Sequence, residues 1–95
     1  MKKLLAAAML AITFTVWAGD FEDGLAAYKR GDYATAAAKV QQGANQGNAD
    51  AQLLLGLMYD QGQGVTQDYA EAARWYTLAA EQGIAAAQVK LALMY

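Results

Sequence analysis

The sequence predicts an all-α protein built from repeated helix pairs, and three observations support this fold class. The chain matches itself when it is shifted by 36 positions, because residues 32–59 and 68–95 share 15 identities in 28. A fixed period of this length is typical of a repeat array. Apolar residues recur at helical spacing, while the scarcity of valine and isoleucine disfavours a sheet. Proline is absent, which favours uninterrupted helices.

The first 18 residues have the three parts of a secretory signal peptide. Lys2 and Lys3 supply positive charge, residues 4–16 form an apolar run, and Val16-Trp17-Ala18 places small residues at a cleavage site. An uncleaved anchor is the alternative, but this run spans only ~20 Å as a helix, against ~30 Å for a hydrocarbon core. We therefore expect residues 1–18 to be removed and the mature chain to be periplasmic or secreted, with no membrane attachment.

Composition excludes several classes of function. The formal charge is −2, and without Lys2 and Lys3 the chain has 5 basic and 9 acidic residues, so nucleic-acid binding is disfavoured. There is no cysteine, which excludes disulfides and thiolate metal sites. Histidine and serine are also absent, which removes most of the usual catalytic groups.

The mature chain opens with two expected helices. The first covers Asp20–Arg30, since acidic residues begin it and basic residues end it, as the helix dipole favours. Gly31 stops this helix and Asp32 caps the next one, Tyr33–Gln46. The interior Gly43 costs about 1 kcal/mol relative to alanine. We expect it to permit a close approach between helices.

Three more helices are expected, over residues 50–61, 69–82 and 85–95. The apolar face of the third consists of Ala51, Leu54, Leu55, Met58 and Tyr59. Asp68 and Glu71 have the spacing of a capping box at the start of the fourth. The expected buried stripe of that helix consists of Tyr69, Ala72, Ala73, Tyr76 and Ala80, with Trp75 beside it. The fifth helix copies the third, and its apolar residues lack a following partner helix.

The residues from 51 to 83 resemble a Sel1-like repeat, a relative of the tetratricopeptide repeat. The resemblance rests on Ala51, Gln52, Leu55, Gly56, Tyr59, Gly62, Gly64, Val65, Asp68, Ala72, Trp75, Tyr76, Ala79, Ala80 and Gly83. Residues 24–47 resemble a tetratricopeptide-type unit. This divides the mature domain, 19–95, into a first helix pair at 19–48, a complete repeat at 49–84 and the first helix of an incomplete repeat at 85–95. In that last helix Ala92 replaces the usual glycine.

The resemblance implies about five helices, arranged as antiparallel pairs stacked into a right-handed superhelix. Small residues such as Gly56 and Ala72 would let the helices approach, and Leu55, Trp75 and Tyr76 would fill the layers between them. Gly62 and Gly64 would allow positive backbone φ angles in the loop.

The candidate catalytic and metal-binding motifs each have a structural explanation. The Gly62-x-Gly64 pair follows a helix and lacks the lysine of a phosphate loop. Asp60 lacks the further acidic ligands of a calcium loop. Some secreted Sel1-like proteins have been linked to β-lactam binding or hydrolysis. A serine or zinc mechanism needs residues that this chain does not have. We expect no enzyme activity, no metal and no cofactor.

The remaining prediction is the binding of a protein or peptide. Tetratricopeptide-like arrays present a concave surface formed largely by the first helix of each pair. The resemblance places eleven residues there, which we call the predicted concave residues: Phe21, Leu25, Tyr28, Lys29, Asp50, Leu53, Leu57, Asp60, Gln61, Val89 and Leu93. Such a mixture of apolar and charged side chains suits a peptide or a partner helix.

A second hypothesis concerns the last helix. Its unpartnered apolar residues are also expected of a truncated repeat fragment, which would self-associate or pair with a longer repeat protein.

Overall fold

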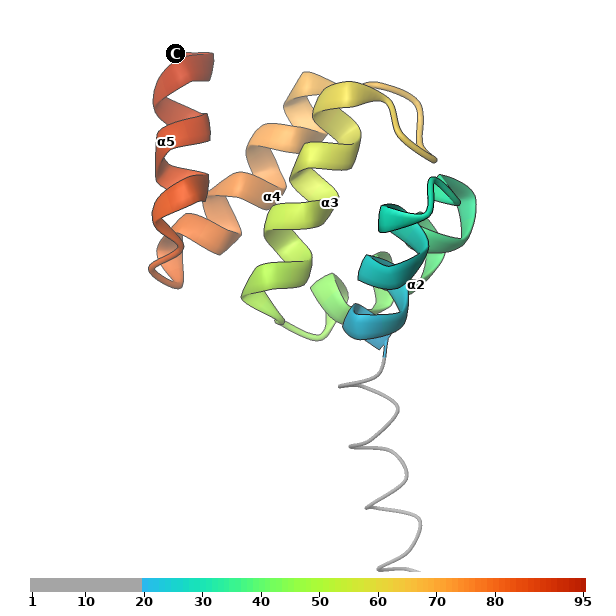
Figure 1. Ribbon diagram of the computed structural model, residues 1–95. Helices are drawn as coiled ribbons and strands as arrows, with labels where there is room; N and C mark the ends of the chain where they lie inside the picture. Colours follow the sequence, from blue (N-terminus) through green and yellow to red (C-terminus); the bar gives the residue numbers. More distant parts are fainter. Residues whose placement is uncertain (1–19) are drawn as a thin grey trace, which may run out of the picture.

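The computed structural model describes residues 20–95, and this part of the chain is helical without strands. Residues 20–29 form an N-terminal helix, which is followed by α2 (Tyr33–Asn45), α3 (Ala49–Gln61), α4 (Tyr69–Glu81) and α5 (Ala85–Met94). From α2 onward the helices pack in chain order, each against the next (Figure 1). The all-α helix-pair prediction is therefore confirmed. The expected signal peptide and its cleavage site lie outside the described residues.

Local side chains fix where three of the helices begin. The side chains of Asp32, Asn48 and Asp68 accept hydrogen bonds from the backbone N–H three residues later, which caps α2, α3 and α4. Ile84 holds the position of Asn48 in the next repeat and makes no such bond to α5. The helix ends consequently agree with the predicted ones to within one residue.

The capping box predicted for α4 is only half formed. Asp68 Oδ1 accepts a hydrogen bond from the Glu71 N–H at 3.1 Å. The Glu71 carboxylate does not complete the box, because it accepts a bond from Arg74 at 3.1 Å. The Asp68 N–H donates to the Tyr59 carbonyl oxygen at 2.9 Å. The end of α3 thus satisfies the donor that the glutamate was expected to satisfy.

The loop between α3 and α4 folds back onto the start of α2. Gly64 lies in this loop with a φ of 74°, and a Cβ atom there would collide with the carbonyl group of Tyr33. One residue earlier, the Gln63 side chain accepts a hydrogen bond from the Tyr28 hydroxyl at 2.9 Å. Gly64 is therefore required both for its backbone angle, as predicted, and for this close approach. The loop ties the complete repeat to the helix pair before it.

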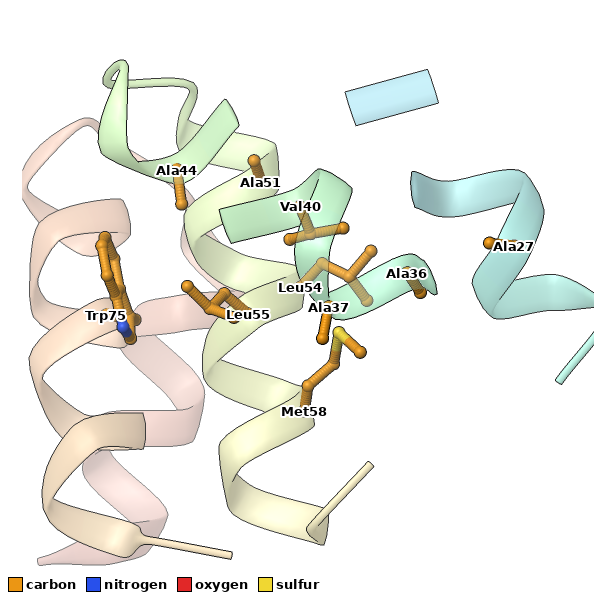
Figure 2. Close-up of a cluster of buried hydrophobic side chains, with 10 residues drawn as sticks. All are labelled: Ala27, Ala36, Ala37, Val40, Ala44, Ala51, Leu54, Leu55, Met58 and Trp75. Carbon is orange, nitrogen blue, oxygen red and sulfur yellow. The ribbon is translucent and has the colours of Figure 1, made fainter. Parts of the chain in front are cut away.

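One hydrophobic cluster joins the N-terminal helix, α2, α3 and α4 (Figure 2). Leu55 and Met58 of α3 are fully buried in it, together with Val40 of α2. Trp75 of α4 belongs to the cluster drawn in Figure 2 and is only 4% exposed. Trp75 therefore lies in the core, as the repeat resemblance implied, and not beside the buried stripe of α4, as the helical spacing predicted.

A second cluster lies between α4 and α5 and consists of Ala72, Tyr76, Ala79 and Ala87. Because α4 packs against α3 as well as α5, it has two buried sides, with Trp75 and Tyr76 in different clusters. The stripe predicted for α4 was wrong at its first member, since Tyr69 is 60% exposed. A helix packed on two sides does not follow the single-stripe pattern on which that prediction relied.

Two glycines inside helices allow the close approach that was predicted. A Cβ atom on Gly56 would lie 2.6 Å from the Tyr76 ring, so this ring packs directly on the α3 backbone. A Cβ atom on Gly43 would lie 3.2 Å from the Ala51 side chain. Both positions are buried, and both lie where neighbouring helices meet.

One hydrogen bond recurs with the period of the sequence. The Gln52 side chain donates to the Ala44 carbonyl at 3.3 Å, and the Gln88 side chain donates to the Ala80 carbonyl at 3.3 Å. Each pair of partners is shifted from the other by one repeat. Gln82 adds a further link, because its amide donates to the Gly47 carbonyl at 3.0 Å and to Gln52 Oε1 at 2.9 Å.

Candidate binding surface

A hollow of about 230 Å³ lies between the N-terminal helix and α3, and we call it the first hollow. Its lining is apolar except for one carboxylate, and consists of Phe21, Leu25, Asp50, Leu53, Leu54 and Leu57. Five of these six are predicted concave residues. The structure therefore brings together, on two neighbouring first helices, residues that are 25 or more positions apart in the sequence.

Helical spacing explains why these side chains share one side. Phe21 and Leu25 are one turn apart on the N-terminal helix, and Leu53 and Leu57 are one turn apart on α3. Asn48 caps α3, which places Asp50 in the first helical turn, where a negative charge is favoured by the helix dipole. Asp50 is exposed, while the leucines are half-buried. The hollow therefore has an apolar floor and an acidic side chain at its edge.

A second hollow, of about 340 Å³, lies where α3, α4 and α5 meet. Its lining consists of Asp60, Tyr69, Leu93 and Met94. Asp60 and Leu93 are predicted concave residues, whereas Tyr69 and Met94 are not among the predicted concave residues. Leu93 is 77% exposed, which makes it one of the most accessible large apolar side chains of the described chain.

Asp60 is held in place by the neighbouring helix. Its Oδ2 accepts a hydrogen bond from the Tyr76 hydroxyl at 3.1 Å. Burial, and then the nearby Asp60 carboxylate, raise the pKa of Tyr76 well above its ordinary value. Tyr76 therefore remains a neutral donor across the physiological range and fixes the orientation of Asp60.

The other predicted concave residues line neither hollow. The Tyr28 ring packs against Tyr33 with 5.2 Å between centroids, and its hydroxyl bonds to Gln63, so it supports the loop. Lys29 and Gln61 are exposed near the carboxyl ends of their helices. Val89, on α5, is 57% exposed.

Two lining residues show what the sequence pattern missed. Leu54 was assigned to the apolar face of α3 and is buried, yet it also forms part of the first hollow. Tyr69 was assigned to the core, and it lines the second hollow. Tyr69 is the first residue of α4 and directly follows the N-cap Asp68 and the loop between α3 and α4. This position next to a loop indicates solvent exposure and could have been used to predict it.

The charge around the hollows is negative and unpaired. Within residues 20–95 the ion pairs are Arg30–Asp32, Lys39–Asp20 and Arg74–Glu71. Neither Asp50 nor Asp60 takes part in one. The described part of the chain contains no group of three or more side chains that could hold a metal ion. None of the helices in this range is long and apolar enough to cross a membrane.

Consecutive helices that each pack on the next, with hollows beside the first helices, define an α-helical repeat protein. The family model for the Sel1 repeat matches residues 49–84. Residues 49–84 are therefore a Sel1 repeat, and the resemblance seen in the sequence is confirmed. Proteins with this repeat are typically scaffolds for protein interactions.

Solved structures that are similar to this chain include the following two. A Sel1 repeat protein from Oxalobacter formigenes is 35% identical with a TM-score of 0.72, over 79% of this chain and 32% of that one. A protective antigen present in uropathogenic Escherichia coli strains, displaying an SLR fold, is 38% identical with a TM-score of 0.70, over 76% of this chain and 16% of that one. No curated protein matches the chain. The chain thus spans a third or less of the length of both similar structures.

Proposed function

We propose that this protein is an exported, non-catalytic scaffold that binds a protein or peptide on the face formed by its N-terminal helix, α3 and α5. The first hollow is the observation that carries the proposal, because an apolar floor with an acidic edge can receive an apolar side chain of a partner. The absence of cysteine, histidine and serine from the sequence supports a non-catalytic role. It also disfavours the β-lactam alternative, which needs such groups.

Site-specific photo-cross-linking in the living host tests the binding role. A cross-linking amino acid at position 53, in the first hollow, is expected to give a discrete protein adduct. The same amino acid at position 38, which is exposed on α2, is the matched control and should give none. Leu57→Gln should weaken the adduct at position 53 without changing the helical circular dichroism signal. Equal adducts at both positions, or none at position 53, would contradict the proposal.

Export is tested by cell fractionation and intact-mass measurement. The apolar run behind Lys2 and Lys3 supports export, and cleavage after Ala18 is expected to leave a periplasmic or secreted chain that begins at Gly19. A chain of full mass in the membrane fraction would show an uncleaved anchor instead.

Self-association is a second candidate role, and the exposed apolar side chains of α5 favour it. Val89 and Leu93 are one helical turn apart, and Tyr95 beyond them is 94% exposed. Sedimentation velocity over a range of concentrations is expected to show a dimer that Leu93→Gln weakens. A monomer at every concentration would remove this candidate and leave the partner-binding role unaffected.

A further inference from the structure

We propose that α3 presents a docking strip, Asp50–Leu53–Leu57–Asp60, for an amphipathic helix of a partner protein. The partner helix would supply two apolar side chains with a basic residue at each end. This inference rests on the proposed binding function and adds the secondary structure and the charge of the partner.

The four residues form a continuous row along the helix. Their spacings of three, four and three positions keep them on one side of α3, and ten positions separate the two carboxylates by about 15 Å along the axis. Asp50, Leu53 and Leu57 line the first hollow, and Asp60 lines the second. Leu57 also packs against both hydrophobic clusters. The strip therefore connects the two hollows.

The charges on the strip lack partners within the described chain. Asp50 is exposed and makes no ion pair, and Asp60 uses one carboxylate oxygen to hold the Tyr76 hydroxyl. The cations Arg30, Lys39 and Arg74 are paired elsewhere. The remaining cations, Lys29 and Lys90, line neither hollow and form no ion pair within the described residues. A partner with a basic residue at each end of its apolar pair would complement the strip.

The lining of the first hollow favours a helix over an extended peptide. Its side chains offer a single polar group, the Asp50 carboxylate. An extended peptide would bring backbone N–H and C=O groups onto this apolar floor, where they would lose water without gaining a hydrogen bond. A helix satisfies its own backbone and presents only side chains, which is how amphipathic helices bind apolar grooves.

The direct test uses two synthetic helical peptides. Both peptides carry two leucines four positions apart. The charged residue at each end lies three positions from the nearer leucine, so the spacing matches that of the strip. One has lysine at each end, the other has glutamate at each end, and all other positions are alanine or glutamine. Fluorescence anisotropy with the purified full-length gene product is expected to show about tenfold tighter binding of the lysine peptide at low salt. This preference should narrow at high salt, because exposed charges are screened.

Two variants assign the preference to the strip. Asp50→Lys should reduce the affinity for the lysine peptide about fivefold and raise the affinity for the glutamate peptide. Glu81→Lys is the matched control. It makes the same change in net charge at an exposed position outside both hollows and should leave the preference nearly unchanged. Circular dichroism verifies that both variants keep their helices.

Three results would overturn the inference, and each is distinguishable from failure of the proposed function. They are equal binding of the two peptides, equal effects of the two variants, and binding of neither peptide. If any of them occurs while the partner still cross-links at position 53, then the scaffold role is retained. The claim that the strip selects a helix with basic ends is then wrong. Loss of that cross-link, in contrast, contradicts the proposed function itself.

Discussion

At Gly56 the missing side chain makes room for an aromatic ring. The ring of Tyr76 occupies the place of a Cβ atom, which would lie 2.6 Å from two ring carbons. Because Tyr76 is fully buried, the ring has no open space into which it could move. Ala92 holds the equivalent position one repeat later and is exposed on α5. The same repeat position therefore has opposite requirements in the two helices.

Exchanging the residues at these two positions should destabilise the protein for opposite reasons. Gly56→Ala improves helix propensity, yet we expect a loss of about 1–3 kcal/mol in the free energy of unfolding, from overpacking. Ala92→Gly relieves no crowding and should cost about 1 kcal/mol through propensity alone. Chemical denaturation monitored by circular dichroism measures both. A stabilising Gly56→Ala would contradict the packing described for Tyr76.

Tyr76 should also give the protein a specific alkaline response. Burial and Asp60 raise its pKa in the folded state above the ordinary value of 10.0. A group with a raised pKa stabilises the fold fully below its unfolded pKa, and the stabilisation is lost as the pH rises beyond that value. Tyr76→Phe should cost about 1 kcal/mol at pH 7 through the lost hydrogen bond. Above pH 10 the difference in the free energy of unfolding between Tyr76→Phe and the wild type should become smaller, because only the wild type loses this stabilisation.

Thermal unfolding at pH 7 and pH 11 measures this narrowing. Tyr95→Phe is the control, because it removes the same hydroxyl group from a side chain that is 94% exposed. If the difference between Tyr76→Phe and the wild type is the same at both pH values, then the tyrosine does not ionise with unfolding.

At the scale of elements, the turns were the most predictable feature. Asp32 and Asp68 lie directly before the helices that they cap, and glycines follow the helices before them, so these predicted signals are local in sequence. The Asn48 cap was not predicted, and α3 begins one residue earlier than expected. The burial pattern of α4 was less predictable. The exposure of Tyr69 and the burial of Trp75 depend on which two helices enclose α4. The helical spacing does not specify this, and only the repeat resemblance placed Trp75 in the core.

The candidate surface divides in the same way. Most of the lining of the first hollow was predicted, because residues such as Phe21, Leu25 and Leu53 lie at the positions that the repeat resemblance assigns to the concave face. The second hollow adds Tyr69 and Met94, which come from α4 and α5. Their proximity to Asp60 results from the packing of three helices. The hydrogen bonds from Tyr28 to Gln63 and from Tyr76 to Asp60 could not be predicted from local patterns either, because their partners are far apart in the sequence.

The loop between α3 and α4 offers a test at this scale. Gly64→Ala should destabilise the protein more than Gly83→Ala does. Both residues have positive φ angles, which cost an alanine about 1–3 kcal/mol. At Gly64 the added methyl group would also meet the Tyr33 carbonyl, whereas at Gly83 it would meet nothing within 4 Å. Denaturation of both variants gives the comparison, and equal losses would show that the loop can move away from α2.

Across the whole molecule, stability should fall toward α5. In α3, an Asn48 cap and six buried residues hold the helix between two neighbours. In α5, only Ala87 is buried and no side chain caps the first turn. Local opening costs less where few groups are buried. The array should therefore be least protected at α5.

Amide hydrogen exchange followed by mass spectrometry should show this gradient. Peptides from α5 are expected to exchange faster than peptides from α3. Asn48→Ala should speed the exchange of α3, because removing a cap costs about 1 kcal/mol. Uniform protection from α3 to α5 would indicate that the described helices open only together.

The recurring glutamine bond has a consequence for how such a chain can lengthen in evolution. Gln52 donates to Ala44 and Gln88 donates to Ala80, so the joint between successive helix pairs is made with the same two atoms each time. A tandem duplication of residues 49–84 would create a joint of this kind at each of its ends, with the new copy of Gln52 meeting Ala80. Gene duplications of one period are thus expected to yield folded proteins, whereas insertions of other lengths would separate the amide from its acceptor.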